Sequence, residues 1–266
     1  MNGFLVTIPH SGEKIPTDLT PWLMNLPEKI LMADVDRYVD VLYQASLKEL
    51  QLPFVKTEWH RYAVDLNRIP SDVDASSVIG NSTAAGTHPR GYHWVSTTLG
   101  DTLMLKPMTH SNHQELTHLI YEPFHAQIHS EYEKFKKNQA KKIFHLDAHS
   151  MPSVGTKSHR DPDQRRADIV VSDCLGKSCS LNFKDLVISA YEKSGFKVAY
   201  NWPYVGGRVT EQYGEPSKEH HVIQVEMNRD LYMNEITKKI KSETTAEIQL
   251  KVKNALQEIK SKISSL

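Results

Sequence analysis

The spacing of apolar residues along the chain predicts strands that alternate with helices. Short runs rich in β-branched residues predict strands at residues 4–8, 54–57, 62–66, 142–149, 167–172, 197–200 and 222–226. Apolar residues that recur every three or four positions predict helices at 28–50, 113–140, about 182–194 and 236–266. Pro123 lies inside the second helix and predicts a kink or break there, because proline has no N–H to donate. The alternation predicts an α/β sandwich with a mixed sheet.

Two segments lack this regular spacing. Residues 70–91 are rich in Ser, Gly, Asp and Pro and predict a long loop, which in a compact domain is often a lid or a binding loop, with disorder as the alternative. Gly206 and Gly207 predict a flexible turn that leads into a strand, because glycine permits positive φ and close backbone approach. We find no repeat and no linker, so we expect residues 1–266 to form a single domain.

Composition excludes several classes of protein. The 266 residues carry a formal net charge of +0, whereas general nucleic-acid binders carry a basic surplus. No run approaches the roughly 18 apolar residues of a membrane span, and the N-terminus lacks the pattern of a secretory signal. Cys174 and Cys179 are the only cysteines, which favours reduced thiols. We therefore expect a soluble, cytoplasmic protein without nucleic-acid or membrane partners, and the sequence leaves its oligomeric state open.

Four polar clusters stand at the ends of predicted strands. They are His10-Ser11-Gly12-Glu13, Asp65-Leu66-Asn67-Arg68, His145-Leu146-Asp147-Ala148-His149 and Glu226-Met227-Asn228-Arg229. Ligands of open α/β sheets bind beyond the carboxyl ends of the strands. We therefore expect all four clusters to meet in one cleft.

The first candidate chemistry is a metal site. Catalytic zinc is held by imidazole nitrogens and a carboxylate, with one position left open for water. His10 and His149 would supply the imidazoles, and the carboxylate would come from Glu13, Asp34 or Asp36. His145, Asp147 and His149 share one strand face, so Asp147 would either bind the metal or orient a ligand histidine.

Two further clusters suggest a base and an anion clamp. Glu226 ends an apolar strand, where a carboxylate is costly to bury unless it has a partner or a role. We interpret it as a general base, with an ion pair to Arg229 or a lysine as the alternative. Asn67 and Arg68 suit a substrate carboxylate, because guanidinium binds it through two parallel hydrogen bonds; a surface arginine is the alternative. Arg208 is a second candidate for an anionic group.

Other catalytic chemistries find no support in the sequence. It contains no Gly-x-Ser-x-Gly elbow, no Gly-rich phosphate loop followed by Lys-Ser/Thr and no Gly-x-Gly-x-x-Gly. The two cysteines have no obvious basic partner, which disfavours a thiol nucleophile.

With these residues identified, the chain resembles the N-formylglutamate amidohydrolase family along nearly its whole length. The matching segments, in chain order, are residues 6–12, 33–40, 61–68, 121–125, 147–150, 206–207 and 224–227, the last followed by 231–233. More distantly, the family resembles zinc carboxypeptidases and aspartoacylases. The resemblance implies one catalytic domain with a three-layer α/β/α, zinc-dependent exopeptidase-like fold around a mixed central sheet.

The resemblance also implies roles for individual residues. His10 and His149 would bind one zinc ion together with a carboxylate, and Glu226 would be the base. The family regularly carries the acids that match Asp34 and Asp36, so we favour Asp36 over Glu13 as the third ligand. Asp147 and His125 would support the site, and they are the alternative bases.

Substrate recognition is implied by the Asp-Leu-Asn-Arg run, which holds the substrate carboxylate in aspartoacylase-like enzymes and matches residues 65–68. Related sequences commonly have an arginine where this chain has Glu211. Arg208 would take its place, although strand alternation puts positions 208 and 211 on opposite faces.

The leading hypothesis is metal-dependent hydrolysis of the amide of an N-acyl amino acid, with N-formyl-L-glutamate yielding formate and L-glutamate, as in histidine breakdown in this family. One alternative keeps the mechanism and changes the substrate to a peptide, an acyl-aspartate or another acyl-glutamate. Another is a non-catalytic carboxylate-binding protein on the same fold.

Overall fold

A six-stranded mixed sheet forms the centre of the computed structural model, which describes residues 2–81 and 90–266. The strands are β1 (Gly3–Ile8), β2 (Phe54–Lys56), β3 (Ile143–Met151), β4 (Ile169–Ser172), β5 (Val198–Tyr200) and β6 (His220–Asn228). Their order in the sheet is β2-β1-β3-β6-β4-β5. In this sheet β2, β1, β3 and β6 run parallel to one another. Strand β4 is antiparallel to β6, and β5 is parallel to β4. The predicted mixed sheet is confirmed.

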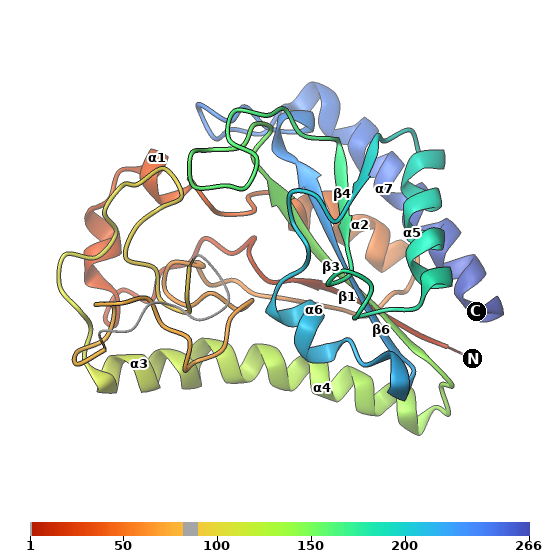
Figure 1. The fold of residues 1–266 in the computed structure, drawn as a ribbon, viewed down its shortest axis with the longest axis horizontal. Helices are drawn as coiled ribbons and strands as arrows, with labels where there is room; N and C mark the ends of the chain where they lie inside the picture. The colour runs from red at the N-terminus through yellow and green to blue at the C-terminus, as the bar shows by residue number, and fades with distance from the viewer. Residues whose placement is uncertain (1, 82–89) are drawn as a thin grey trace.

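Helices cover both faces of this sheet and complete the predicted α/β/α layers (Figure 1). One face carries α2 (Val39–Glu49), α5 (Leu181–Lys193) and α7 (Ser242–Lys262), and the other carries α3 (His110–Leu116), α4 (Glu122–Lys137) and α6 (Arg208–Tyr213). Single 3-10 turns lie at Pro21–Asn25, Pro216–Lys218, Arg229–Leu231 and Ile263–Ser265. Each face has its own apolar core, because alternate strand residues point to opposite sides.

The helix predicted over residues 28–50 is interrupted in its middle. The structure has a short α1 (Glu28–Leu31) and then α2, and the residues between them are not helical. Tyr38 has a left-handed φ of 69°, and the Asp36 N–H donates to the His10 carbonyl at 3.0 Å. This interruption ties the Asp34–Asp36 segment to the end of β1.

The helix predicted over residues 113–140 begins earlier, at His110, and changes its winding before Pro123. Thr117–Tyr121 is π-helical, and the Glu122 N–H donates to the Thr117 carbonyl. The wider turn directly precedes Pro123, which donates no backbone hydrogen bond. The C-terminal helix is shorter than the predicted 236–266, because α7 spans Ser242–Lys262.

Two strand predictions are wrong. Residues 62–66 form turns joined by irregular backbone, and the strand expected after Gly207 is the helix α6. Of the predicted loop at 70–91, residues 82–89 lie outside the described part of the chain, and the remainder consists of turns and irregular backbone.

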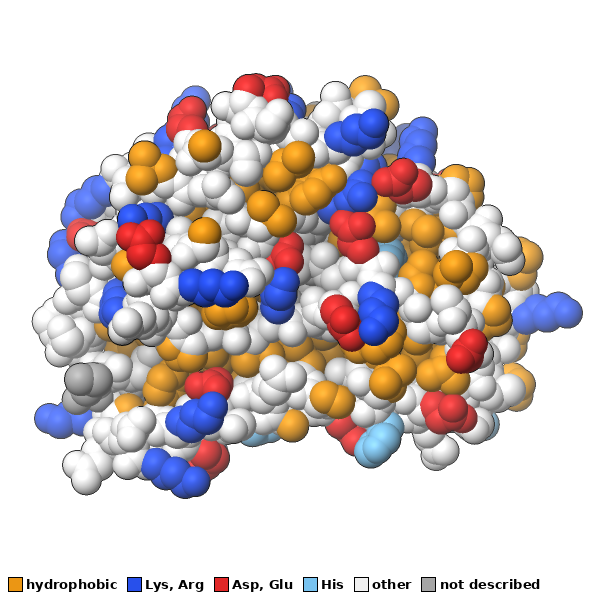
Figure 2. All heavy atoms as spheres, turned by 180° about the vertical axis from the view of Figure 1, so that it is seen from behind, with side chains coloured by type: hydrophobic (Ala, Val, Ile, Leu, Met, Phe, Trp, Pro, Cys, Tyr) orange, Lys and Arg blue, Asp and Glu red, His pale blue; other side chains and the backbone are white. Residues whose placement is uncertain are grey.

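The surface matches the neutral composition. Figure 2 shows basic and acidic side chains interspersed over one face of the molecule, without a broad field of one sign. None of the helices in the described residues is long and apolar enough to cross a membrane.

Candidate active site

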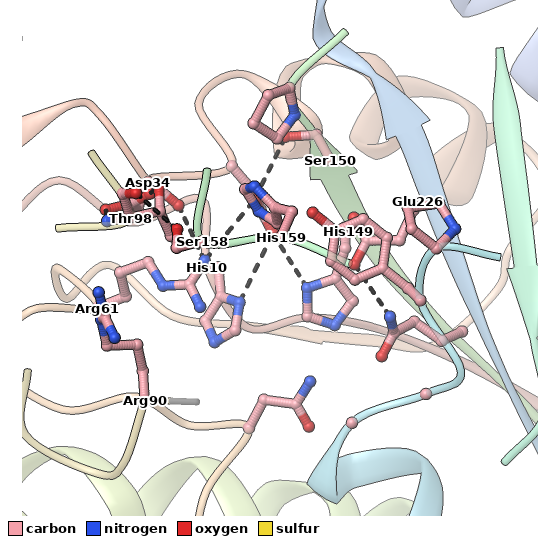
Figure 3. Close-up of a pocket in the computed structure, with 18 of the residues that line it drawn as sticks. His10, Asp34, Arg61, Arg90, Thr98, His149, Ser150, Ser158, His159 and Glu226 are labelled. Carbon is pink, nitrogen blue, oxygen red and sulfur yellow. Dashed lines mark hydrogen bonds and ion pairs between the residues drawn. The ribbon is translucent and has the colours of Figure 1, made fainter. Parts of the chain in front are cut away.

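A cavity of about 420 Å³ opens beyond the carboxyl ends of the parallel strands. His10 follows β1, His149 stands near the end of β3, and Glu226 near the end of β6. Figure 3 shows His10, His149 and Glu226 around this cavity. Five arginines also line it: Arg61, Arg68, Arg90, Arg160 and Arg229. The cavity thus combines potential metal ligands with a strongly cationic wall.

Three of the predicted ligands meet at one point. One ligand atom from each of His10, Asp36 and His149 lies within 4.8 Å of the others, and all three residues are buried. Nδ1 of His149 is 3.0 Å from Asp36 Oδ2, and Nδ1 of His10 is 3.6 Å from the same oxygen. Both imidazoles therefore present the same nitrogen to one carboxylate oxygen.

The opposite nitrogens of the two rings are held by other aspartates. His10 Nε2 donates to Asp65 Oδ1 at 2.8 Å, and His149 Nε2 donates to Asp147 Oδ2 at 2.7 Å. Since an ionised carboxylate only accepts, these contacts place the proton on Nε2 and leave Nδ1 available as a metal ligand. Such carboxylate–imidazole pairs orient the ligand histidines of metal sites.

Asp36 is itself fixed in place by an arginine. Arg229 Nη2 donates to Asp36 Oδ1 at 3.0 Å, and the Ser150 hydroxyl donates to the same oxygen at 3.3 Å. Oδ1 is thus engaged away from the histidines, and Oδ2 faces them. Burial raises the pKa of Asp36, but the adjacent His10 and His149 side chains outweigh it and hold the pKa well below its ordinary value.

Glu226 lies beside His149 on the neighbouring strand, where the two residues are register partners of β3 and β6. Its Oε1 accepts a hydrogen bond from Gln224 Nε2 at 2.9 Å. Burial raises the pKa of Glu226 to about 7; the positive charge of His149 opposes this shift, and the negative charge of Asp36 adds to it. A carboxylate with a pKa near neutrality is suited to proton transfer.

Asn67 and Arg68 line the cavity from a turn. Arg68 Nε donates to the Arg90 carbonyl at 2.5 Å, and Nη1 donates to the Asn67 carbonyl at 2.6 Å. Asn67 Oδ1 accepts from the Val209 N–H at 2.6 Å, and a Cβ at Gly207 would lie 2.0 Å from Asn67 Nδ2. A glycine is thus required at 207 for the Asn67 amide to sit there.

Two other predicted site residues, Arg208 and Glu13, lie outside the cavity lining. Arg208 is outside the cavity lining and pairs with Glu211 at 3.5 Å, because both are on the helix α6, three residues apart. The expectation that 208 and 211 face opposite ways is therefore wrong. Glu13 pairs with Arg37 at 2.7 Å and does not join the group of His10, Asp36 and His149.

His125 supports the turn that carries Asn67 and does not contact the histidines of the ligand group. Its Nδ1 lies 2.7 Å from the Tyr213 hydroxyl, and its Nε2 lies 3.2 Å from the Leu66 carbonyl oxygen. Burial lowers the pKa of His125 to about 4, which makes it neutral at physiological pH and a poor proton acceptor.

Sequence reasoning missed part of this arrangement. It assigned Asp65 to the substrate-binding run, whereas the carboxylate contacts His10 and, through Oδ2, Arg61 Nη2 at 2.9 Å. No local pattern marks the contact with His10, because 55 positions separate the two residues in the sequence. Gln224 was also missed, although strand alternation places it on the same face as Glu226, two residues away.

Comparisons with known proteins identify the family. The model of the N-formylglutamate amidohydrolase family matches residues 2–233. The N-formylglutamate deformylases of Pseudomonas putida and Pseudomonas aeruginosa PAO1 are 25% and 27% identical to this chain, and each alignment covers 87% of this chain and 82% of the relative.

Two solved structures share the fold. The N-formylglutamate amidohydrolase from Ralstonia eutropha JMP134 superposes with a TM-score of 0.86 at 24% identity, over 100% of this chain and 96% of that one. A gene product of Agrobacterium tumefaciens superposes with a TM-score of 0.73 at 17% identity, over 99% and 92% of the two chains.

Proposed function

Because this chain belongs to the N-formylglutamate amidohydrolase family, we propose that it is a metal-dependent hydrolase of N-acyl amino acids whose first substrate to test is N-formyl-L-glutamate. Both curated relatives are named as N-formylglutamate deformylases. The reaction would add water across the formyl amide and release formate and L-glutamate. The observation that carries the proposal is the convergence of His10, Asp36 and His149 beside the base candidate Glu226.

The residues present fit a divalent metal ion. Nδ1 of His10 is buried and has no hydrogen-bond partner among the described residues, which is the state expected of an atom that serves as a ligand. Burial lowers the pKa of His149, but the negative charge of Asp147 and the contacts of His149 with Asp147 and Asp36 outweigh it and raise the pKa well above its ordinary value. The site thus favours positive charge at the position that a cation would take.

His10, Asp36 and His149 would hold the ion, and two imidazoles with one carboxylate form a common zinc donor set. A bound zinc ion supplies Lewis-acid chemistry, in that it acidifies water and polarises an amide carbonyl. Asp65 and Asp147 would keep the imidazoles oriented, while Glu13 is engaged by Arg37.

Glu226 would act as the general base. It would take a proton from the attacking water and deliver that proton to the amine nitrogen as the C–N bond breaks. Gln224 holds one carboxylate oxygen, which fixes the orientation of the other. Burial raises the pKa of Glu226, so the carboxyl group can hold the proton between the two transfers.

The cationic wall would select an anionic substrate. We propose that Asn67 and Arg68 bind the α-carboxylate, since both line the cavity and a guanidinium group recognises a carboxylate with directional hydrogen bonds. Arg208 stands outside the lining, so the side-chain carboxylate of the substrate would be met by another arginine of the cavity.

A metal analysis combined with an activity assay tests the proposal. The purified protein should contain about one divalent ion per chain, lose formate release after chelation, and recover it when Zn²⁺ is restored. A panel of N-formyl, N-acetyl and peptide substrates then defines the acyl group. Stoichiometric ligand binding without metal and without hydrolysis of any acyl amino acid would indicate a carboxylate-binding protein instead.

A further inference from the structure

Tyr204 lines the cavity, and the mechanism above gives its hydroxyl no role. Tyr204 belongs to the segment between β5 and α6 and lines the cavity together with Glu226. The Ser172 hydroxyl donates to the Tyr204 carbonyl at 2.9 Å, which anchors the backbone of the residue. The backbone of Tyr204 is therefore tied to the end of β4.

A buried ion pair sets the direction of the Tyr204 hydroxyl. Arg166 Nη1 donates to the hydroxyl oxygen at 3.0 Å, and the guanidinium carbon lies 5.1 Å from the centre of the ring. Arg166 is held in turn by Asp161 through two hydrogen bonds of 2.7 and 2.8 Å, and by the Pro152 carbonyl at 3.1 Å. Both side chains of this ion pair are buried.

The hydrogen bond from Arg166 does not use the phenolic proton of Tyr204, which remains available to another acceptor. Arginine only donates, so Arg166 occupies an acceptor position of the hydroxyl and directs its proton elsewhere. No acceptor for that proton is found among the residues that the structure describes. Burial raises the pKa of Tyr204, and the negative charge of Glu226 raises it further, so the hydroxyl stays protonated at neutral pH.

We propose that Tyr204 is a further catalytic residue, whose O–H donates a hydrogen bond to the acyl oxygen of the substrate as that oxygen gains negative charge, with Arg166 and Asp161 as positioning residues. The inference rests on the proposed hydrolase function. In the step, water forms a C–O bond and the C=O electron pair moves onto the acyl oxygen, which accepts the Tyr204 hydrogen bond. The pair returns as the C–N bond breaks, and Glu226 carries the proton from water to the amine. Tyr204 keeps its proton throughout.

Tyr204→Phe removes the donor while keeping the ring. We expect kcat on N-formyl-L-glutamate to fall about 10²–10³-fold, as for loss of one oxyanion donor, while KM and metal content change little. Tyr200→Phe is the matched control, because the Tyr200 hydroxyl bonds Asp173 outside the cavity lining and its loss should leave kcat unchanged.

A sulfur-substituted substrate separates a catalytic from a structural role. Sulfur is a weak hydrogen-bond acceptor, so the ratio of wild-type to Tyr204→Phe activity should shrink to a few-fold on the N-thioformyl analogue. An equal ratio for the oxygen and sulfur substrates would overturn the inference. A loss confined to KM, abolished when a substrate carboxylate is removed, would also overturn it, because Tyr204 would then bind that carboxylate.

Arg166→Lys tests the positioning role. It should lower kcat in the wild-type background and have little further effect in the Tyr204→Phe background, since the two groups act as one unit. Additive losses would show that Arg166 acts independently of Tyr204. If the wild-type protein hydrolyses no N-acyl amino acid, the proposed function fails; if it is active and Tyr204→Phe matches it, only the Tyr204 inference fails.

Discussion

The two faces of β3 show how one strand serves two different purposes. Phe144, Leu146 and Ala148 point to the apolar core beneath α2, α5 and α7. Asp147 and His149 alternate with them on the opposite face, where His149 lines the cavity and Asp147 bonds it from behind. Apolar packing stabilises the first face without directional requirements, whereas every polar group on the second needs a partner in the right geometry. Substitutions on the two faces should therefore affect different properties.

The largest effect on activity is expected on the polar face at the ligand positions. His149→Ala and His10→Ala should each lose the bound ion and lower kcat/KM about a thousandfold or more, since the metal contributes several kcal/mol to the transition state. Metal content and formate release measure both effects. His145→Ala is a matched control, because His145 is a buried neighbour on β3 that bonds Thr7 and Tyr132 outside the ligand group.

The same measurement identifies the third ligand. Asp36→Asn should lose the ion, while Glu13→Gln should retain it and break only the ion pair with Arg37. Full metal occupancy in Asp36→Asn would remove Asp36 from the site.

A smaller loss is expected at Glu226, on the neighbouring strand. Glu226→Gln keeps the size of the side chain but cannot accept a proton, so kcat should fall about 10²–10⁴-fold with the metal still bound. A base works only when deprotonated, so wild-type activity should decline as pH falls through the pKa of Glu226, which burial raises, and the variant should lose that limb of the pH–rate profile. Loss of metal from the glutamine variant would make Glu226 a ligand instead.

Arg68 should give a loss that depends on the substrate. Arg68→Lys keeps the charge but loses the planar fork of donors, which should weaken transition-state binding by about 1.5–3 kcal/mol for substrates with a free α-carboxylate. Kinetics with the α-ester of the same substrate provide the control, because the ester should lose little. Equal losses for acid and ester would assign Arg68 a structural role, as a donor to the Arg90 and Asn67 carbonyls.

The smallest effect on activity is expected from the apolar face. Leu146→Ala should lower the free energy of unfolding by about 2–5 kcal/mol through the cavity it leaves. The kcat of the remaining folded enzyme should stay near the wild-type value. Denaturant unfolding measures the free energy of unfolding. Kinetics normalised to the concentration of active sites measure the kcat of the folded enzyme. A large fall in kcat per folded molecule would show that the two faces are coupled.

Much of the fold could be predicted because strong periodicity marks it. The strands that carry His149 and Glu226 are apolar runs, and strand alternation correctly placed His145, Asp147 and His149 on one face. Residues 62–66 misled the prediction because an apolar run there folds into turns held by side chains: the Tyr62 hydroxyl bonds Asp34 at 2.7 Å, and Asp65 bonds His10. These contacts link distant segments and leave no local pattern.

In the candidate site, too, some residues could be predicted from the sequence and others could not. His10, Asp36 and His149 were proposed from residue type and family resemblance, and the structure brings them together. Arg208 was misplaced because Gly206 and Gly207 suggested a strand where a short helix begins. The role of the Arg166–Asp161 ion pair could not be predicted from the sequence. Arg166 contacts Tyr204, and 38 positions separate these two residues.

The origin of the three proposed ligands links metal uptake to the stability of the chain. His149 and Asp36 are separated by 113 positions in the sequence, and Asp36 is held at the site by its N–H, which donates to the His10 carbonyl, and by Arg229. An unfolded chain cannot assemble this geometry, so an ion that binds there binds the native state alone. By mass action, free metal at a hundred times its dissociation constant would add about 2.7 kcal/mol to the free energy of unfolding. The thermal midpoint of the protein should therefore report the metal supply of its surroundings.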